Sequence, residues 1–264
     1  TAALFFGPPD KAEQWDGSSW TEIAELNTER QYPGGAGTST AALAIGGDTD
    51  PGIVAITEEW NGSTWTEVAD LGTARRQNFG SGTSTSALAS GGYTSTQVAN
   101  VEEWSFPSTP VVQEGQLWIK TATGTSSVMK GYQAAGTGAW ASGGALNTAR
   151  EFLNSAGTQT ASLGFGGRSG STTYDLTEKY DGSSWTEVGD LNTGRFGLGG
   201  TGTQTAAIGY GGATPPGNTD VDVAETFNGT SWSEVGDLNT SRRAVGSVGS
   251  TSTAALAVSG VTTG

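Results

Sequence analysis

The chain has 264 residues and a formal net charge of −14, with 26 acidic residues against 12 lysines and arginines. That balance argues against a nucleic-acid groove, in which basic side chains must neutralise phosphates. Cysteine and histidine are both absent, which excludes disulfides, Cys/His zinc sites and Ser-His-Asp catalytic triads.

The first predicted element is already part of a repeat. Thr1 opens a T-A-A-L motif that returns later in the sequence as the middle of a second strand, and here no first strand precedes it. The C-terminus, in contrast, supplies a first and a second strand and stops at Gly264. Two interpretations stay open. The chain is a segment or processed form of a longer repeat protein, or both termini close a ring and leave one strand over.

Two residue series that run in step measure the repeat. Five tryptophans and five arginines are each separated by 45, 75, 45 and 47 residues, and each arginine follows its tryptophan by ten. The tryptophans are Trp20, Trp65, Trp140, Trp185 and Trp232. The arginines are Arg30, Arg75, Arg150, Arg195 and Arg242. A period near 45 residues is typical of a protein built from one repeated supersecondary unit.

Each unit predicts four short strands. A glycine-rich run follows the arginine, and the T-A-A-L-x-x-G-G block forms the second strand. E-x-aromatic and S-x-W-x-E-V form the third and fourth strands, joined by Asp-Gly or Asn-Gly, which supplies the positive φ that primed hairpin turns need. Four antiparallel strands at this period make one blade of an all-β propeller. We expect a single propeller over residues 1–264, with five recognisable blades plus a partial one, and six blades preferred.

The 75-residue step locates an insert in the third blade. Trp104 and Trp140 are 36 residues apart, whereas the corresponding aromatics of the other units are 5 apart, so 31 residues are inserted within 105–137. Gly115–Lys120 and Ser127–Tyr132 flank T-A-T-G-T-S and predict a second small hairpin. Trp118 lies in this insert, outside the repeat, which makes it a candidate sugar-stacking residue.

The recurring residues are interpreted as scaffold. A glutamate lies two residues before each third-strand aromatic, at Glu13, Glu58, Glu102, Glu178 and Glu225. We predict that each repeat arginine pairs with one of these glutamates or with backbone carbonyls, because a guanidinium is a fork of donors. The tryptophans are predicted to stack between blades. A catalytic site would need one exceptional copy of the repeat, and the copies look alike.

The variable stretches all join a second strand to a third. They span Asp48–Ile56, Tyr93–Val101, Arg168–Thr177 and Ala213–Ala224. Alternating strand direction places these 2–3 loops on one face with the 4–1 connections, and the insert, a 3–4 loop, on the opposite face. Variation against a constant scaffold is typical of a binding surface. The candidate binding residues are Asp48, Asp50, Tyr93, Arg168, Tyr174, Asp220 and Asp222, together with Trp118 of the insert.

The G-G after the second strand, the aromatic in the third and the W in the fourth resemble the kelch repeat, over nearly the whole chain outside the insert. The motif N-G-S-x-W-T-E-V-x-D-L-N-T-A-R, followed by G-T-Q-T-A-A-L-x-x-G-G, resembles the repeats of kelch-like proteins of marine bacteriophages. The insert's E-G-Q-L-W-I-K and V-M-K-G-Y are similar to hairpins of phage tail and fibre proteins. The resemblance implies a non-enzymatic virion or extracellular component, such as a tail fibre, that attaches to the host surface.

The implied partners are a host-surface glycan or protein, other virion proteins and further copies of the chain in a homo-oligomer. Nucleic acid, membrane insertion and a cofactor are not expected. Two other functions stay open: a carbohydrate-active propeller enzyme of glycosidase or sugar-epimerase type, using carboxylates and arginines, and an intracellular kelch interaction module. Kelch-type copper oxidases are excluded, because they need histidine and cysteine.

Overall fold

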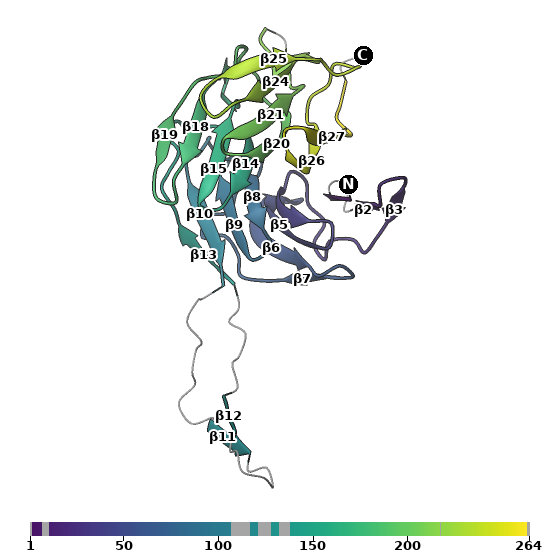
Figure 1. Ribbon diagram of the computed structural model, residues 1–264, viewed down its shortest axis with the longest axis vertical. Coiled ribbons are helices and arrows are strands. Elements are labelled where there is room, and N and C mark those ends of the chain that lie inside the picture. The colour runs from purple at the N-terminus through teal and green to yellow at the C-terminus, as the bar shows by residue number, and fades with distance from the viewer. Residues whose placement is uncertain are drawn as a thin grey trace.

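The computed structural model describes residues 2–6, 11–106, 117–120, 128–131, 138–216 and 218–262, in which the regular elements are all β-strands. Most of the strands form four-stranded antiparallel sheets in which neighbours in sequence are neighbours in space. The sheets surround a common centre (Figure 1). This arrangement is a β-propeller, and it confirms the predicted all-β fold of four-stranded antiparallel blades.

Five blades follow one another along the chain. The first has three strands: β1 (Ala3–Phe6), β2 (Ala12–Trp15) and β3 (Trp20–Glu22). Blade 2 comprises β4 (Gly34–Thr38), β5 (Ala41–Asp48), β6 (Ile53–Trp60) and β7 (Trp65–Glu67). Blade 3 comprises β8 (Phe79–Thr83), β9 (Ser86–Ser90), β10 (Val101–Ser105) and β13 (Ala139–Ser142). Blade 4 comprises β14 (Asn154–Thr158), β15 (Ala161–Phe165), β18 (Thr177–Tyr180) and β19 (Trp185–Glu187). Blade 5 comprises β20 (Gly199–Thr203), β21 (Ala206–Tyr210), β24 (Ala224–Phe227) and β25 (Trp232–Val235).

A two-stranded sheet follows blade 5. It consists of β26 (Gly246–Thr251) and β27 (Ala254–Val258), which are the first and second strands of a further unit. This is the partial blade that the sequence predicted. The described residues therefore make five blades and not the preferred six, because no third or fourth strand pairs with β27. β26 contacts both β20 and β1, so the first and last sheets lie next to each other (Figure 1).

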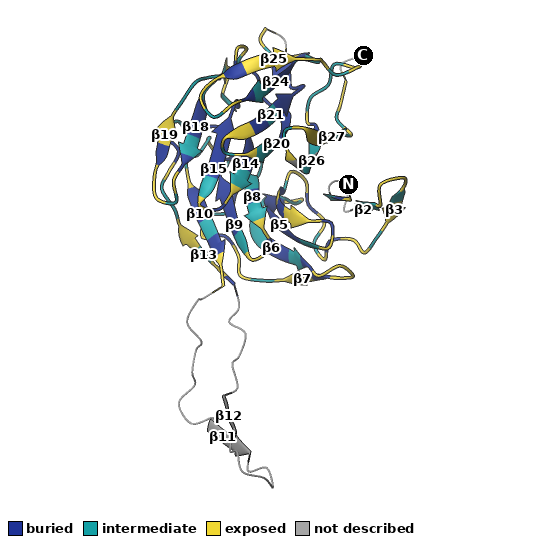
Figure 2. Cartoon of the chain, viewed as in Figure 1, coloured by how far each residue is buried: buried dark blue, intermediate teal, exposed yellow. Residues whose placement is uncertain are grey.

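The glycine-rich first strands line the centre of the ring. β4 contacts β8, β8 contacts β14, and β14 contacts β20, so these strands lie side by side around the axis. Small residues allow this approach: a Cβ added to Gly80 would lie 2.4 Å from the carbonyl oxygen of Gly35 in the neighbouring blade. The second strands β5 and β15 are deeply buried, whereas the outer strands such as β7 and β19 are largely exposed (Figure 2).

The G-G pair at the end of each second strand holds the next blade close. Gly46 and Gly47 have φ of +62° and +126°, a region that favours glycine. A Cβ on Gly46 would lie 2.4 Å from the carbonyl oxygen of Arg75, and the amide of Gly47 donates to that same oxygen at 3.0 Å. The pair is thus required for main-chain contact between blades 2 and 3.

Buried ion pairs join successive blades, as predicted for the repeat arginines. The described pairs are Arg30–Glu58, Arg75–Glu102, Arg150–Glu178 and Arg195–Glu225, all with fully buried guanidinium groups. Arg195 lies 2.8 Å from Glu225 and also donates to the carbonyl oxygens of Gly211 and Val223. Burial lowers the pKa of Arg195, and the Glu225 carboxylate acts in the opposite direction. Arg242 precedes the partial blade and donates instead to the carbonyl oxygen of Ser259.

The repeat tryptophans stack within and between blades. Each packs on the third-strand aromatic of its own blade, with ring centres 5.0 to 5.5 Å apart. Some of them also contact the preceding blade: the indole N–H of Trp140 donates to the Thr57 hydroxyl, and that of Trp232 donates to the Thr177 hydroxyl. The predicted inter-blade role of the tryptophans is confirmed.

The hairpins between third and fourth strands are closed by four-residue loops. Trp15 pairs with Trp20, so residues 16–19 form the loop, and Gly17 alone has positive φ. The prediction of a hairpin is confirmed, but its turn is not of the two-residue primed type. One side-chain oxygen of Asp16 accepts the amides of Ser18 and Ser19. These side-chain hydrogen bonds stabilise the turn, which needs only one residue with positive φ.

This turn predicts an acid-sensitive group. Hydrogen bonds, chiefly from the backbone of Ser184, lower the pKa of Asp181 to about 2, below its unfolded value of roughly 3.9. The ionised carboxylate therefore stabilises the fold above about pH 4, and this contribution is lost as the pH falls towards 2. We expect Asp181→Asn to remove this pH dependence while keeping the turn, because Asn61 and Asn228 form the same contacts in blades 2 and 5. Carboxyl NMR titration of the wild type checks it; an Asp181 pKa near 4 contradicts it.

The insert leaves and rejoins blade 3 at neighbouring positions. Ser105 at the end of β10 pairs with Ala139 at the start of β13. Within the insert, β11 (Leu117–Lys120) and β12 (Val128–Gly131) pair antiparallel, with Trp118 opposite Lys130. These strands correspond to the small hairpin predicted from the sequence. The side chain of Trp118 lies outside the described residues.

Candidate functional site

The candidate site is the face that carries the 2–3 loops and the 4–1 connections. Two of these loops are themselves small hairpins, one of β16 (Arg168–Ser169) and β17 (Thr172–Thr173), the other of β22 (Ala213–Thr214) and β23 (Thr219–Asp220). The first loop is shorter than expected. β5 runs through Asp48 and β6 begins at Ile53, so most of the predicted Asp48–Ile56 stretch is strand.

Local backbone bridges position the side chains of this face. In each unit, the residue after the repeat arginine pairs with the residue after the G-G or close to it. The bridges are Gln31–Asp48, Arg76–Tyr93, Glu151–Arg168, Phe196–Ala213 and Arg243–Val261. Three of the chain's arginines lie outside the repeat series, and all three occupy these bridge positions. This face therefore gathers every arginine that the scaffold does not use.

Arg76 connects blades 2 and 3 on this face. Its guanidinium forms an ion pair with Asp48 of the preceding blade and lies 5.1 Å from the ring centre of Tyr93. Both charged side chains remain about a quarter exposed. The structure thus brings Asp48 and Tyr93, two predicted residues, together around an arginine that the sequence did not single out.

Arg168 is the most firmly oriented arginine of the face. Its Nε donates to Glu151 at 3.1 Å, and its guanidinium lies 4.8 Å from the ring centre of Phe152 and 4.4 Å from that of Phe196. A guanidinium that lies over two neighbouring rings gains cation–π stabilisation and loses little freedom on binding. Its side chain is 27% exposed, so part of it is accessible from solvent in an orientation set by these contacts.

Arg243 repeats the pattern between blade 5 and the partial blade. It donates to Asp220 at 2.9 Å and to the carbonyl oxygen of Asn218 at 3.0 Å. The Asp220 side chain is buried, and that of Arg243 is 30% exposed. The three arginine–carboxylate pairs are therefore similar in exposure, with one pair for each of three bridge positions.

The other predicted residues are not gathered around these arginines. Asp50 is exposed at the tip of the β5–β6 connection. Tyr174 and Asp222 are half-buried, and their backbone groups take part in the 4–1 connections: Tyr174 accepts the amide of Arg195, and Asp222 accepts that of Leu238. The sequence reasoning missed Arg76, Glu151, Phe152, Phe196 and Arg243. The sequence did contain a signal for them: the residues directly after the repeat arginine differ from unit to unit, whereas the arginine itself is present in every unit.

An unusual backbone conformation recurs once in each unit, just before the glycine-rich first strand. One residue of each unit, two positions after the repeat arginine, has φ between 52° and 62°: Tyr32, Gln77, Phe152, Gly197 and Ala244. The amide of Gln77 donates to Tyr32, that of Gly197 to Phe152, and that of Ala244 to Gly197. Positive φ is uncommon in residues other than glycine and is concentrated at functional sites. We call these five residues the collar.

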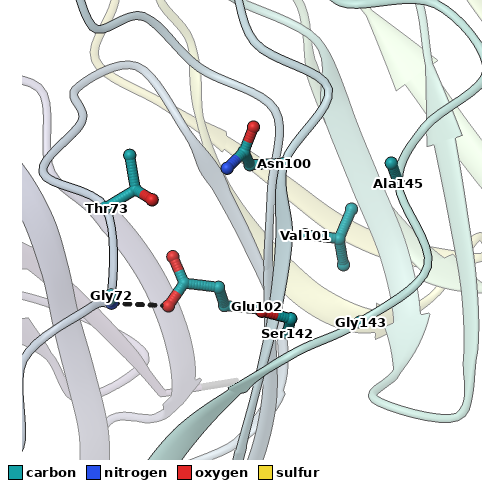
Figure 3. A pocket seen from close by; sticks show the side chains of 8 residues that line it. All are labelled: Gly72, Thr73, Asn100, Val101, Glu102, Ser142, Gly143 and Ala145. Carbon is teal, nitrogen blue, oxygen red and sulfur yellow. Dashed lines mark hydrogen bonds between the residues drawn. The ribbon is translucent and has the colours of Figure 1, made fainter.

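An open cavity of about 330 Å³ lies on the same face beside blade 3 (Figure 3). Thr73, Asn100 and Glu102 contribute polar groups to its wall, and Val101, Gly143 and Ala145 contribute small apolar ones. Among the described residues, no three acidic side chains are grouped to hold a metal ion. The described part of the chain also has no helix with the length and apolar character needed to cross a membrane.

Comparisons with known proteins identify the fold. No protein-family model and no curated protein sequence matches the chain. Among solved structures, the one titled "Structure of YjhT" is similar, with a TM-score of 0.71 and 12% sequence identity over 97% of this chain and 85% of that one. At this identity, the likeness shows a shared propeller fold.

Proposed function

We propose that this propeller is a non-enzymatic attachment module of a virion or other extracellular structure, which binds a host-surface glycan or protein through its 2–3 loop face. One observation carries the proposal: the three arginines outside the scaffold all lie on that face, each oriented by a carboxylate and partly exposed. Exposed Tyr32 and half-buried Phe152 in the collar and Tyr93 in a 2–3 loop add aromatic surface of the kind that glycans and protein epitopes contact.

The resemblance of the repeat sequences to those of phage proteins supports the virion assignment. Their kelch-like pattern supports a propeller used for binding. A non-enzymatic role is favoured because the carboxylates nearest the exposed arginines, Asp48, Glu151 and Asp220, are each engaged in an ion pair. We further propose that the chain assembles with other virion proteins. A glycosidase or sugar-epimerase activity is the alternative that the same experiment detects.

The test is binding of the fluorescently labelled chain to an array of bacterial capsule and lipopolysaccharide glycans and to whole host cells. We expect Arg168→Ala to weaken binding at least tenfold, because a preoriented guanidinium contributes about 1.4 kcal/mol or more in a charge-assisted contact. Asp181→Asn, on a 3–4 turn of the opposite face, is the matched control and should bind normally. Unchanged binding by Arg168→Ala contradicts the assignment of the face, and turnover of a bound sugar supports the enzyme instead.

A further inference from the structure

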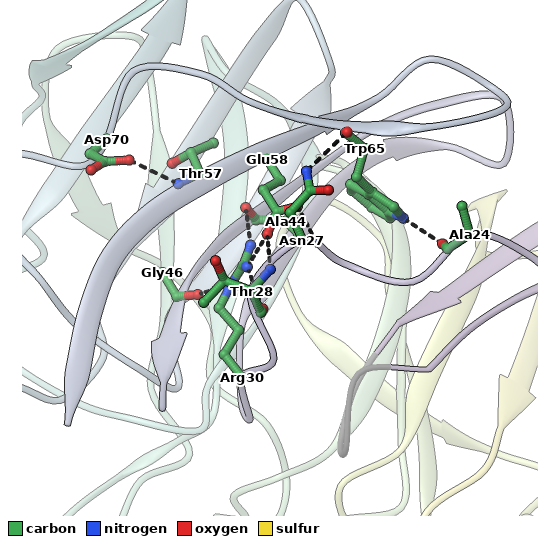
Figure 4. Close-up of polar contacts among 10 residues, drawn as sticks. All are labelled: Ala24, Asn27, Thr28, Arg30, Ala44, Gly46, Thr57, Glu58, Trp65 and Asp70. Carbon is green, nitrogen blue, oxygen red and sulfur yellow. Dashed lines mark hydrogen bonds and ion pairs between the residues drawn. The ribbon is translucent and has the colours of Figure 1, made fainter. Parts of the chain in front are cut away.

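The blade junctions are built from the same side chains, with one exception. At the junction with blade 2, the amide of Asn27 donates to Glu58 at 2.7 Å and its side chain donates to the carbonyl oxygen of Trp65 at 3.0 Å (Figure 4). Asp70 accepts the amide of Thr57 (Figure 4). The junctions with blades 4 and 5 use Asn147, Asn192, Asp190 and Asp237 in the same positions, except that the side chain of Asn192 donates to Glu225 and not to a tryptophan carbonyl oxygen.

The junction with blade 3 lacks the filling side chains. Gly72 stands where the others have asparagine, and Ala145 stands where they have aspartate. Blade 3 also has Ser142 and Gly143 where the other complete blades have glutamate and valine. All four truncated positions line the 330 Å³ cavity (Figure 3). The cavity therefore coincides with smaller residues at four positions of one copy of the repeat.

The truncations leave hydrogen-bonding capacity unused. Ala145 has no carboxylate to offer the amide of Val101, whereas aspartate accepts the corresponding amide in blades 2, 4 and 5. Val101 also replaces the threonine that receives a tryptophan N–H in the neighbouring copies, and the buried indole nitrogen of Trp185, which packs in one cluster with Val101, has no partner among the described residues. An unpaired buried donor is costly in a scaffold that satisfies it elsewhere.

The chemistry of the wall selects a class of ligand. Thr73 and Ser142 present hydroxyls, and Asn100 presents a carboxamide, all of which both donate and accept. Glu102 accepts the amide of Gly72 at 2.6 Å (Figure 3). Its carboxylate also pairs with Arg75 and neutralises that guanidinium, so the cavity wall offers no free positive charge. Such a wall matches the hydroxyls of a neutral sugar and disfavours an anion. The volume is at the lower end of that of small-molecule sites, which suits a single sugar ring.

We propose that this cavity is a subsite for one neutral sugar ring, either free or at the end of a host glycan. The subsite deepens the proposed attachment function and rests on it for its biological ligand. It is separate from the arginine-lined positions, because none of Arg76, Arg168 and Arg243 lines the cavity. The exceptional copy that the repeat would need for a site is therefore blade 3.

The test uses the full chain with glucose, galactose, mannose and N-acetylglucosamine as probes, in saturation-transfer NMR and calorimetry. The variant G72N/A145D restores the side chains of the other junctions. It is expected to fold, because a Cβ at Gly72 meets only the end of the Glu102 side chain, at 3.1 Å. We expect at least one of the four sugars to bind the wild type and to bind G72N/A145D at least tenfold more weakly.

Matched substitutions separate the possible outcomes. Gly236→Asn introduces the same residue where an added Cβ meets nothing within 4 Å, and it should bind sugar normally. Ser142→Glu blocks the cavity from its other side and should also abolish sugar binding. It provides the test if G72N/A145D does not fold. No binding of any of the four sugars, equal binding by the filled variants, or preference for glucuronate over glucose would each overturn the proposal. If G72N/A145D loses sugar binding but still attaches to the host, the subsite stands and its link to attachment is overturned. If Arg168→Ala alone loses attachment, the attachment function stands without a contribution from the subsite.

Discussion

Arg195→Met is expected to destabilise the propeller by about 3–5 kcal/mol, because it leaves the Glu225 carboxylate buried without a counter-charge. The substitution also removes donors from the carbonyl oxygens of Gly211 and Val223, which then lose their hydrogen bonds. For a chain of this size the loss corresponds to a fall in Tm of roughly 6–20 °C. Thermal unfolding followed by circular dichroism measures it.

Two further variants interpret that result. Arg195→Lys keeps the charge but offers a point donor that does not span Glu225 and two carbonyl oxygens, so we expect an intermediate loss. Arg243→Met removes an arginine whose side chain is 30% exposed and should cost no more than about 1 kcal/mol. If Arg195→Lys is as stable as the wild type, the buried pair does not hold blades 4 and 5 together in the way that its contacts indicate.

Trp104→Ala is expected to cost about 3–5 kcal/mol, which is typical of truncating a fully buried large aromatic side chain. The indole packs against Trp140 at a ring-centre distance of 5.5 Å and against the backbone at Gly138, where an added Cβ would lie 2.1 Å from it. Its N–H also donates to the carbonyl oxygen of Ser84 at 2.9 Å. Urea unfolding of the purified chain gives the free energy directly.

Trp104→Phe divides this loss into its two causes. Phenylalanine retains most of the apolar volume but leaves the Ser84 carbonyl oxygen without its donor, so we expect a loss of about 1–3 kcal/mol. A value for Trp104→Phe equal to that for Trp104→Ala would show that the hydrogen bond, and not the packing, dominates at this position. Equal stability of Trp104→Ala and wild type would contradict the structural role of the aromatic pairs.

The sequence predicted the blades well because one set of contacts is repeated at every junction. The spacing of Trp65 and Arg75, repeated along the chain, was enough to define the strand order and to predict a repeat glutamate or backbone carbonyls as partners of Arg75; the structure identifies the glutamate as Glu102. The number of blades was less certain. It depends on how the terminal strands β1 and β27 are used, and both carry the same T-A-A-L pattern.

The candidate site was only partly predictable. Asp48, Tyr93 and Arg168 were found because they lie in variable loops, whereas Arg76 and Arg243 were hidden beside the repeat arginines. Their partners come from other loops or blades, which no local pattern encodes. The cavity beside blade 3 is harder still to foresee, because its signal is the absence of side chains at four separate positions.

The collar has a consequence for how such a surface changes. Its links are made by main-chain atoms, and five dissimilar residues, tyrosine, glutamine, phenylalanine, glycine and alanine, occupy one backbone conformation. Side chains at these positions are therefore exchangeable without altering the links, except that β-branched residues tolerate positive φ poorly. Point mutations at the five collar positions can therefore change what this face recognises, while the main-chain conformation of the collar stays the same.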